Sequence, residues 1–155
     1  MKRVAKLEEE LIKGLEGQDL SGQDFSGVDL RNTDLSKANL KGADLTGAYL
    51  SGANLSRANL TNANLSYANL MGTRLSRANL SRANLTNADL RNADLREADL
   101  INADLRNADL IGANLKYAKL YGTDLRETDL RETNLNYAEF SEKTKTPPYF
   151  KRKRR

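Results

Sequence analysis

The residue types that most often carry out chemistry are either absent from this sequence or isolated. Its 155 residues include no His and no Cys, which removes the imidazole base, the thiolate nucleophile, disulfides and the commonest zinc ligands. Serines are plentiful, as at Ser56, Ser76 and Ser81, but a serine nucleophile needs a base to activate it. We therefore predict a protein that is not an enzyme, with no catalytic residue, no cofactor and no small-molecule substrate.

Carboxylates at regular intervals are the next chemical signal. A run of them occupies Asp89, Asp94, Asp99, Asp104 and Asp109. Arginines follow three of these by two residues, at Arg91, Arg96 and Arg106. That spacing favours exposed ion pairs, each contributing about 0–1 kcal/mol.

A hard cation is the alternative partner for these carboxylates, since Asp89, Asp109 and Asp129 would share one face of a stacked structure. The interleaved Arg91 and Arg131 argue against it. We assign no metal site. Earlier in the chain the same kind of position holds Asn, which can form hydrogen-bonded ladders without charge repulsion. These residues are Asn54, Asn59, Asn64, Asn69, Asn79 and Asn84.

The element that positions all these residues is a repeat of five. Every fifth residue from Leu20 to Phe140 is Leu, except for Phe25 and Phe140 themselves, which makes 25 consecutive units. The residue two before each Leu is mostly Ala, and the one between them is mostly Asn or Asp. Five matches neither the helical period of 3.6 nor the strand period of 2, so a long helix is excluded.

Within each unit Ala and Leu are two residues apart, so they share one side of a short extended segment. A single unit cannot bury its Leu. Stacked coils would bury continuous columns of Leu and Ala and would pair their backbone groups about 4.8 Å apart. The sequence therefore predicts an all-β solenoid of short straight pieces joined by corners.

The unit resembles that of the pentapeptide-repeat family: a small residue, Asn or Asp, Leu, then two variable polar residues. The match covers about four-fifths of the chain. The resemblance implies a right-handed quadrilateral β-helix with four units, or 20 residues, per coil and about six coils. We predict three segments: a short N-terminal capping α-helix within 1–16, the solenoid over 17–140, and a C-terminal cap and basic tail over 141–155.

Both ends of an open stack need covering. Val4, Leu7, Leu11 and Leu15 recur at helical spacing, so we expect an amphipathic helix over 2–14 on the first coil. We read it as a cap, because its acidic run argues against a membrane role. At the other end Pro147–Phe150 either folds across the last coil or leaves it open to another molecule, so a monomer and an end-to-end dimer both remain open.

With 20 residues per coil, the columns predict an interaction surface. One corner column reads Lys37, Arg57, Arg77, Glu97, Tyr117 and Tyr137. With Arg74 beside it, this column could meet phosphates or an acidic partner, and Tyr and Arg are favoured at interfaces. On another face Ile101 and Tyr121 are vertical neighbours that could form a small apolar contact patch.

The net charge of +4 is concentrated in the tail, because residues 17–140 carry 14 basic and 16 acidic groups. The tail ends in Lys151, Arg152, Lys153, Arg154 and Arg155. Five consecutive basic residues could bind nucleic acid in a strongly salt-dependent way. The N-terminus has no apolar run of signal-peptide type, and no segment is apolar enough to span a membrane, so we expect a cytoplasmic protein.

Three functions remain open from the sequence. The first is a non-catalytic scaffold that binds an unidentified macromolecule; its uniform repeats are also what a consensus-like or designed member would show. The second follows from the resemblance, since some family members are DNA mimics that bind type II topoisomerases such as gyrase. This chain departs from them in its near-neutral body, its uninterrupted repeats and its lack of a helical segment after Phe140. The third is nucleic-acid binding through the tail.

Overall fold

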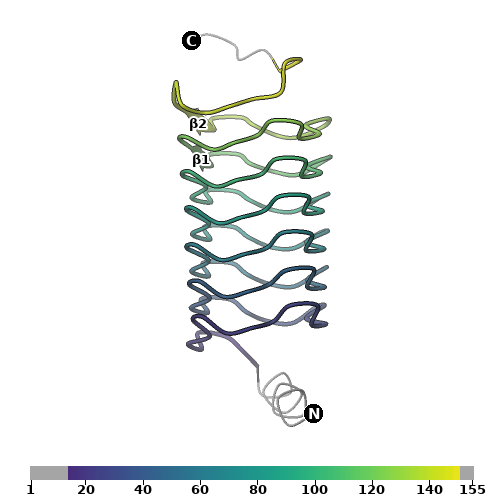
Figure 1. Ribbon diagram of the computed structural model, residues 1–155, viewed down its shortest axis with the longest axis vertical. Coiled ribbons are helices and arrows are strands. Elements are labelled where there is room, and N and C mark those ends of the chain that lie inside the picture. The colour runs from purple at the N-terminus through teal and green to yellow at the C-terminus, as the bar shows by residue number, and fades with distance from the viewer. Residues whose placement is uncertain (1–13, 151–155) are drawn as a thin grey trace.

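The computed structural model describes residues 14–150 as a single stack of similar coils. The chain winds steadily from the N-terminal end to the C-terminal end of this rod, and each coil lies on the one before it (Figure 1). Residues 20 apart pair in parallel along the whole stack, for example Asn39 with Asn59 and Asn64 with Asn84. Four pentapeptides therefore complete one coil.

We name the four sides of the rod after their first inward residue. The Leu15 side contains Leu15, Leu35, Leu55 and every twentieth residue after them. The Leu20, Phe25 and Leu30 sides are defined in the same way. Two segments within residues 14–150 are long enough to count as strands, β1 (Lys119–Leu120) and β2 (Glu139–Phe140), and they pair in parallel on the Leu20 side. Elsewhere each side contributes a single bridge per coil.

Backbone hydrogen bonds hold each pentapeptide to the next coil in a constant pattern. In the unit around Leu80, the N–H of Leu80 donates to the carbonyl of Asp99 at 2.7 Å and that of Arg82 donates to Ile101 at 2.9 Å. In the other direction, the N–H of Asn79 donates to the carbonyl of Ala58 at 2.9 Å. Three bonds per side in every coil satisfy the backbone of the straight pieces, although no piece is a long strand.

Each corner is a tight turn that needs a positive φ at the second of its two outer residues. Its closing bond runs from the N–H of the next inward residue, as from Ala43 to the carbonyl of Leu40 at 3.0 Å. All 25 corner positions from Gly17 to Tyr137 have positive φ, and only nine of them are Gly. The others include Asn, which tolerates this conformation, but also Arg57 and Tyr67, for which it is costly.

The interior is a set of Leu and Ala columns. From Leu35 to Leu125 every inward Leu is 0% exposed, and the inward Ala residues between Ala38 and Ala118 are at most 2% exposed. Thr replaces Ala at a few inward positions, and at Thr73 and Thr123 its hydroxyl donates to a carbonyl in the coil below. Thr73 bonds to Leu50 at 2.8 Å and Thr123 to Leu100 at 2.7 Å. The columns of Leu and Ala predicted from the sequence therefore fill the interior.

At the C-terminal end, residues 141–150 fold across the last coil. Lys145 pairs with Asp124 at a spacing of 21 residues instead of 20, so one extra residue is absorbed there. The Tyr149 hydroxyl donates to the carbonyl of Thr128 at 2.5 Å and accepts the N–H of Leu130 at 3.2 Å. A single phenol thus takes the place of two of the three backbone groups that another coil would offer on the Leu30 side.

At the N-terminal end, the inter-coil ladder already includes Leu15, which the sequence analysis assigned to the cap. Its N–H donates to the carbonyl of Asp34 at 3.2 Å, and its side chain is 2% exposed. The capping helix predicted over 2–14 falls outside the described residues except for Gly14, and residues 14–150 contain no α-helix. That part of the predicted fold is not supported by the structure and stays a prediction.

Candidate interaction surface

The predicted corner column lies along one edge of the rod, where the Leu15 side turns into the Leu20 side. Lys37, Arg57, Arg77, Tyr117 and Tyr137 all have φ between 60° and 63°. All five are exposed. Because the corner backbone holds each side chain at the same place in its coil, successive members lie one coil apart. The fold therefore brings this part of the predicted surface together.

The lower part of the column mixes paired and unpaired cations. Lys37 forms an ion pair with Glu16 at 2.7 Å, and Arg77 forms one with Glu97 at 2.9 Å. The hydrogen bond to Glu97 raises the pKa of Arg77, and that from Arg77 lowers the pKa of Glu97. Arg57, between them, makes no ion pair within residues 14–150.

Arg74 lies on the flat part of the same Leu15 side, where it bridges Asn54 below and Asp94 above. It is exposed, and among the described residues it has no carboxylate within ion-pair distance. Asp94 is instead held by Arg96 at 2.7 Å. Arg57 and Arg74 are thus two exposed cations, on neighbouring coils of one side, that form no ion pair with any described residue.

The upper part of the column is aromatic. The rings of Tyr117 and Tyr137 stack with their centroids 5.0 Å apart and their planes 13° from parallel. The ammonium group of Lys116 lies 5.0 Å from the first ring centroid and 5.8 Å from the second, which is cation–π distance. Both tyrosines are about half exposed, at 47% and 55%. The surface therefore combines cations with a preformed aromatic stack.

The second predicted patch is less accessible. Ile101 and Tyr121 are only partly exposed, and the Tyr121 hydroxyl donates a hydrogen bond to the Glu139 carboxylate. More prominent apolar groups lie at Tyr49, Tyr67 and Met71, which are 51%, 67% and 41% exposed. They lie on or beside the Leu30 side in neighbouring coils. The two tyrosines are not among the residues predicted from the sequence, although their outward repeat positions mark them as exposed.

The carboxylate run is paired as its spacing predicts. Arg91, Arg96 and Arg106 bind the carboxylates of Asp89, Asp94 and Asp104 at 2.6 to 2.7 Å. These bonds lower the pKa of each carboxyl group, because they stabilise its charged form. Within residues 14–150, no three potential ligands gather into a metal-binding cluster.

The Asn positions do more than form ladders. Asn84 donates to Asn64 at 3.0 Å and Asn59 donates to Asn39 at 3.1 Å, which confirms those rungs of the ladder. Asn79 and Asn69 make no such rung within the described residues. What nearly all these positions share is a side-chain oxygen that accepts the backbone N–H two residues later, as from Ser81 to Asn79 at 3.0 Å. This Asx turn explains why the position is mostly Asn or Asp.

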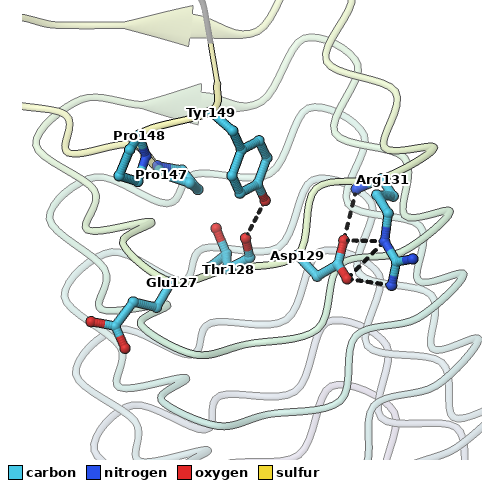
Figure 2. Close-up of a pocket in the computed structure, with 7 residues that line it drawn as sticks. All are labelled: Glu127, Thr128, Asp129, Arg131, Pro147, Pro148 and Tyr149. Carbon is cyan, nitrogen blue, oxygen red and sulfur yellow. Dashed lines mark hydrogen bonds and ion pairs between the residues drawn. The ribbon is translucent and has the colours of Figure 1, made fainter.

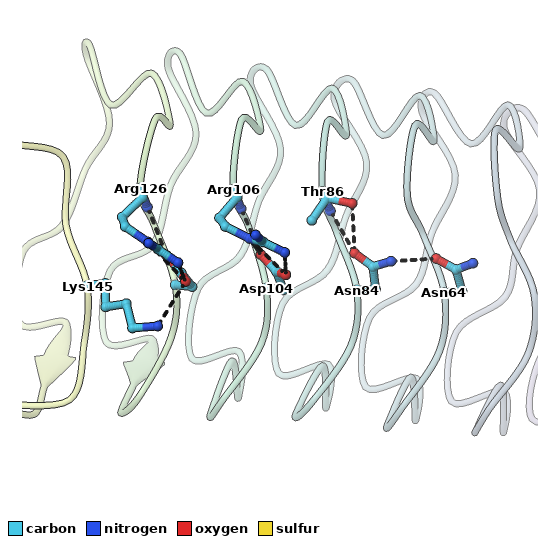
Figure 3. A network of polar contacts seen from close by, with 8 residues as sticks. Asn64, Asn84, Thr86, Asp104, Arg106, Arg126 and Lys145 are labelled. Atoms are coloured by element: carbon cyan, nitrogen blue, oxygen red, sulfur yellow. Dashed lines mark hydrogen bonds and ion pairs between the residues drawn. The ribbon is translucent and has the colours of Figure 1, made fainter.

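Figure 3 shows both kinds of group on the Phe25 side. Asn64 and Asn84 bond from coil to coil, with Thr86 donating back to Asn84. In the next coil the Asp104 carboxylate accepts a hydrogen bond from Arg106 of its own unit. At the C-terminal end, the ammonium group of Lys145 in the cap forms an ion pair with the Asp124 carboxylate at 3.3 Å.

The hollow under the C-terminal cap has a volume of about 430 Å³. Figure 2 shows Tyr149 pointing from the cap to Thr128, Asp129 bound by Arg131, and Glu127 turned away at the rim. Pro147 and Pro148 complete its lining. None of these lining residues is a nucleophile paired with a base.

The comparisons with known proteins place the chain in a family. The model of the pentapeptide repeats matches in eight copies, over residues 15–52, 38–77, 78–116 and 108–142. The chain therefore belongs to the pentapeptide-repeat proteins, whose solved members imply a right-handed β-helix. A search of curated proteins found no match.

Among solved structures, the chain is similar to a pentapeptide repeat protein of the Arabidopsis thaliana thylakoid lumen, with 40% identity and a TM-score of 0.64. The alignment covers 66% of this chain and 71% of that one. HetL of Nostoc sp. PCC 7120, which is involved in heterocyst differentiation regulation, is 35% identical over 78% of this chain and 69% of its own, with a TM-score of 0.38. QnrB1, a plasmid-mediated fluoroquinolone resistance protein, is 19% identical over 83% of this chain and 90% of its own, with a TM-score of 0.34. The last two superpose too poorly to support any argument about function.

The tail Lys151–Arg155, predicted to bind nucleic acid, lies outside the described residues. No helix among residues 14–150 has the length and apolar character that crossing a bilayer requires.

Proposed function

We propose that this chain is a non-catalytic interaction scaffold that binds an acidic segment of a protein partner. Its contact surface is the corner column of Lys37, Arg57 and Arg77, extended by Arg74 and by the stacked pair Tyr117 and Tyr137. The observation that carries the proposal is the pair of exposed guanidinium groups, Arg57 and Arg74, that lack a carboxylate partner among the described residues. The rigid coils hold them in line with the aromatic stack.

Rigidity favours such a surface, because a binding group that is already ordered loses little entropy on association. The corner turns fix the backbone of every member of the column, and the tyrosine stack limits the freedom of both rings. Arg and Tyr are also the residue types enriched at protein interfaces, where Lys and Glu are depleted. A cytoplasmic location fits this proposal and stays a prediction.

The gyrase alternative has no specific observation in its favour. A DNA mimic needs uncompensated negative charge, but six Asp carboxylates on the rod are each bound by the Arg two residues later. These pairs begin at Asp29, Asp89, Asp94, Asp104, Asp124 and Asp129.

The test is affinity capture from a cell lysate with the full chain immobilised at low and moderate salt, with and without nuclease treatment. The double variant Arg57→Glu/Arg74→Glu should lose the captured proteins. Arg82→Glu is the matched control, because Arg82 is an exposed corner arginine with φ of 58° on another side and without an ion pair in the described rod.

Capture that is equal for the wild type and the double variant would remove the column from consideration. Recovery of nucleic acid alone, lost at moderate salt and on nuclease treatment, would favour the tail as the only binding element and would refute the protein partner.

A further inference from the structure

The C-terminal edge of the rod is covered unevenly. In the body of the rod, each side offers three backbone groups to the coil above. On the Leu15 side, the carbonyl of Ala113 accepts from Asn134 at 2.9 Å, the N–H of Leu115 donates to Asn134 at 2.8 Å, and that of Tyr117 donates to Asn136 at 3.1 Å. The same groups recur in the next unit, where the rod ends.

Three sides of the last coil are covered by the cap. On the Phe25 side, Lys145 accepts the N–H of Leu125 at 2.7 Å and donates to Thr123 at 2.9 Å. On the Leu30 side the Tyr149 hydroxyl fills the place of the missing strand. On the Leu20 side, the ring of Phe150 packs against that of Phe140 with centroids 6.1 Å apart.

On the Leu15 side, no residue between 14 and 150 covers Thr133 and Leu135 in this way. The carbonyl of Thr133 and the N–H of Leu135 make no hydrogen bond within residues 14–150, although their equivalents in earlier coils do. Leu135 is partly exposed, whereas Leu95 and Leu115 below it are 0% exposed. We call Thr133, Asn134 and Leu135 the open edge. Unpaired edges of this kind accept strands from other chains.

Charge on both flanks of the open edge indicates what it accepts. Glu132 occupies the corner before it and Glu139 lies just after it; both are exposed, and neither makes an ion pair among the described residues. The Tyr117 and Tyr137 stack at the far corner already holds the ammonium of Lys116 against its rings. Cations at both ends of an added strand would therefore meet complementary groups.

We propose that the open edge binds an extended segment of another protein in parallel register. The segment carries a small residue and a leucine two positions apart, which point inward above Thr133 and Leu135, and a basic residue at each end. Continuity of the ladder fixes the backbone contacts, and the Glu132 and Glu139 carboxylates select the flanks. This site shares the Tyr117 and Tyr137 stack with the surface proposed above, but it requires neither Arg57 nor Arg74.

The rod itself contains a segment with this pattern. Residues 76–83 read SRANLSRA, in which Ala78 and Leu80 point inward between Arg77 and Arg82. A blocked synthetic peptide of this sequence is the probe. When it is titrated into the full ¹⁵N-labelled protein, the NMR signal of the Leu135 amide should shift first, and this amide should become protected from hydrogen exchange. The expected Kd is on the order of 1 mM, as fits a short strand with few hydrogen bonds.

Glu132→Lys should weaken this binding at least about threefold, since it replaces attraction by repulsion at one flank. Glu127→Lys is the matched control and should bind as the wild type does. Glu127 is likewise an exposed corner residue, with φ of 61° against 58° for Glu132, but it leads into the side that Tyr149 covers.

Several results would overturn the proposal. One is equal binding of a peptide in which the leucine is replaced by aspartate, because contact would then be merely electrostatic. Another is a set of shifts centred on any other coil. A Leu135 amide already protected in the free protein would assign the edge to a different occupant. Loss of that protection on dilution would point to a second copy, and loss on replacing residues 151–155 by serine would point to the tail.

Discussion

The Phe25 side of the rod stabilises the same backbone position in two ways in neighbouring coils. Asn64 and Asn84 link one coil to the next through a 3.0 Å amide bond. Asp104 and Asp124 instead bind Arg106 and Arg126 of their own units at 2.6 to 2.7 Å. Both arrangements supply the oxygen that accepts the corner N–H, as from Thr86 or Arg106 at 3.1 Å.

The difference concerns cohesion between coils. An Asn rung crosses the coil boundary, so it contributes only when two coils are stacked. An Asp–Arg pair closes within one pentapeptide and would persist in an isolated unit. Arg91 is a partial exception, since it also approaches Asp109 of the next coil at 3.7 Å. The C-terminal coils therefore rely more on their core and backbone ladder for cohesion than the middle coils do.

The largest effect is expected from truncating core leucines. These variants test whether the core contributes equally to stability in the coils with Asn rungs and in the coils with Asp–Arg pairs. Leu65→Ala and Leu105→Ala each remove a side chain that is 0% exposed on the Phe25 side. Both should lower the free energy of unfolding by about 2–5 kcal/mol, because the rigid columns cannot close the cavity. Urea denaturation of the two variants measures this. The two losses should agree to within about 1 kcal/mol. A larger difference would show that the outer Asn and Asp–Arg groups affect the packing of the core.

A smaller effect is expected from Asn84→Asp. The change removes the donor to Asn64 and places a carboxylate directly below Asp104, its partner in the ladder. We expect a loss of about 1 kcal/mol from the lost bond and the like-charge contact. Asn84→Ser, which also removes the rung but adds no charge, separates the two contributions in the same denaturation assay.

Acid should affect the two regions differently. The pKa of Asp104 and of Asp124 is lowered, first by the hydrogen bond from the following arginine, and the equivalent bond lowers that of Asp29 to about 2. A carboxyl whose pKa is lower in the folded state stabilises the fold above its unfolded pKa of about 3.9, and this contribution is lost as the pH falls through the folded value.

Thermal unfolding between about pH 5 and pH 2 should therefore show a falling Tm. The double variant Asp104→Asn/Asp124→Asn should show a shallower fall than the wild type. An unchanged slope in the variant would mean that the Asp–Arg pairs contribute nothing to folding.

The smallest effect is expected from Asp104→Asn alone near neutral pH. The variant loses an exposed ion pair with Arg106 but gains an amide that can donate to Asn84 below it. These changes nearly cancel, so the free energy of unfolding should stay within about 0.5 kcal/mol of the wild type. High salt should weaken the wild type slightly more than the variant, and calorimetry at two salt concentrations would detect the opposite order.

The sequence predicts the repetitive part of this molecule well, because the five-residue spacing of Leu and Ala identifies the residues of every core column. The pairing of Asp89 with Arg91 also follows from spacing alone. The number of sides came from family resemblance, since a five-residue period does not determine how many corners close a coil. The 20-residue register of the bridges supplies that number.

The candidate sites were less predictable. Spacing placed Tyr117 above Arg77 but did not reveal the stack with Tyr137 or the contact with Lys116, which depend on side-chain conformation. The role of Tyr149 has no signal in the sequence, because it depends on a one-residue shift at Lys145. The open edge at Leu135 follows in turn from where that cap ends.

The register of 20 residues has a consequence for how such a chain can change in length. Inserting one pentapeptide would preserve every inward Leu, yet it would turn all later columns by a quarter of a circumference. Tyr117 and Tyr137 would then leave the corner of Lys37, Arg57 and Arg77, and the cap would reach different sides. An insertion that keeps the surface intact must therefore add a whole coil of 20 residues. The residues that share a corner column are thus determined by the 20-residue coil and not by the five-residue repeat.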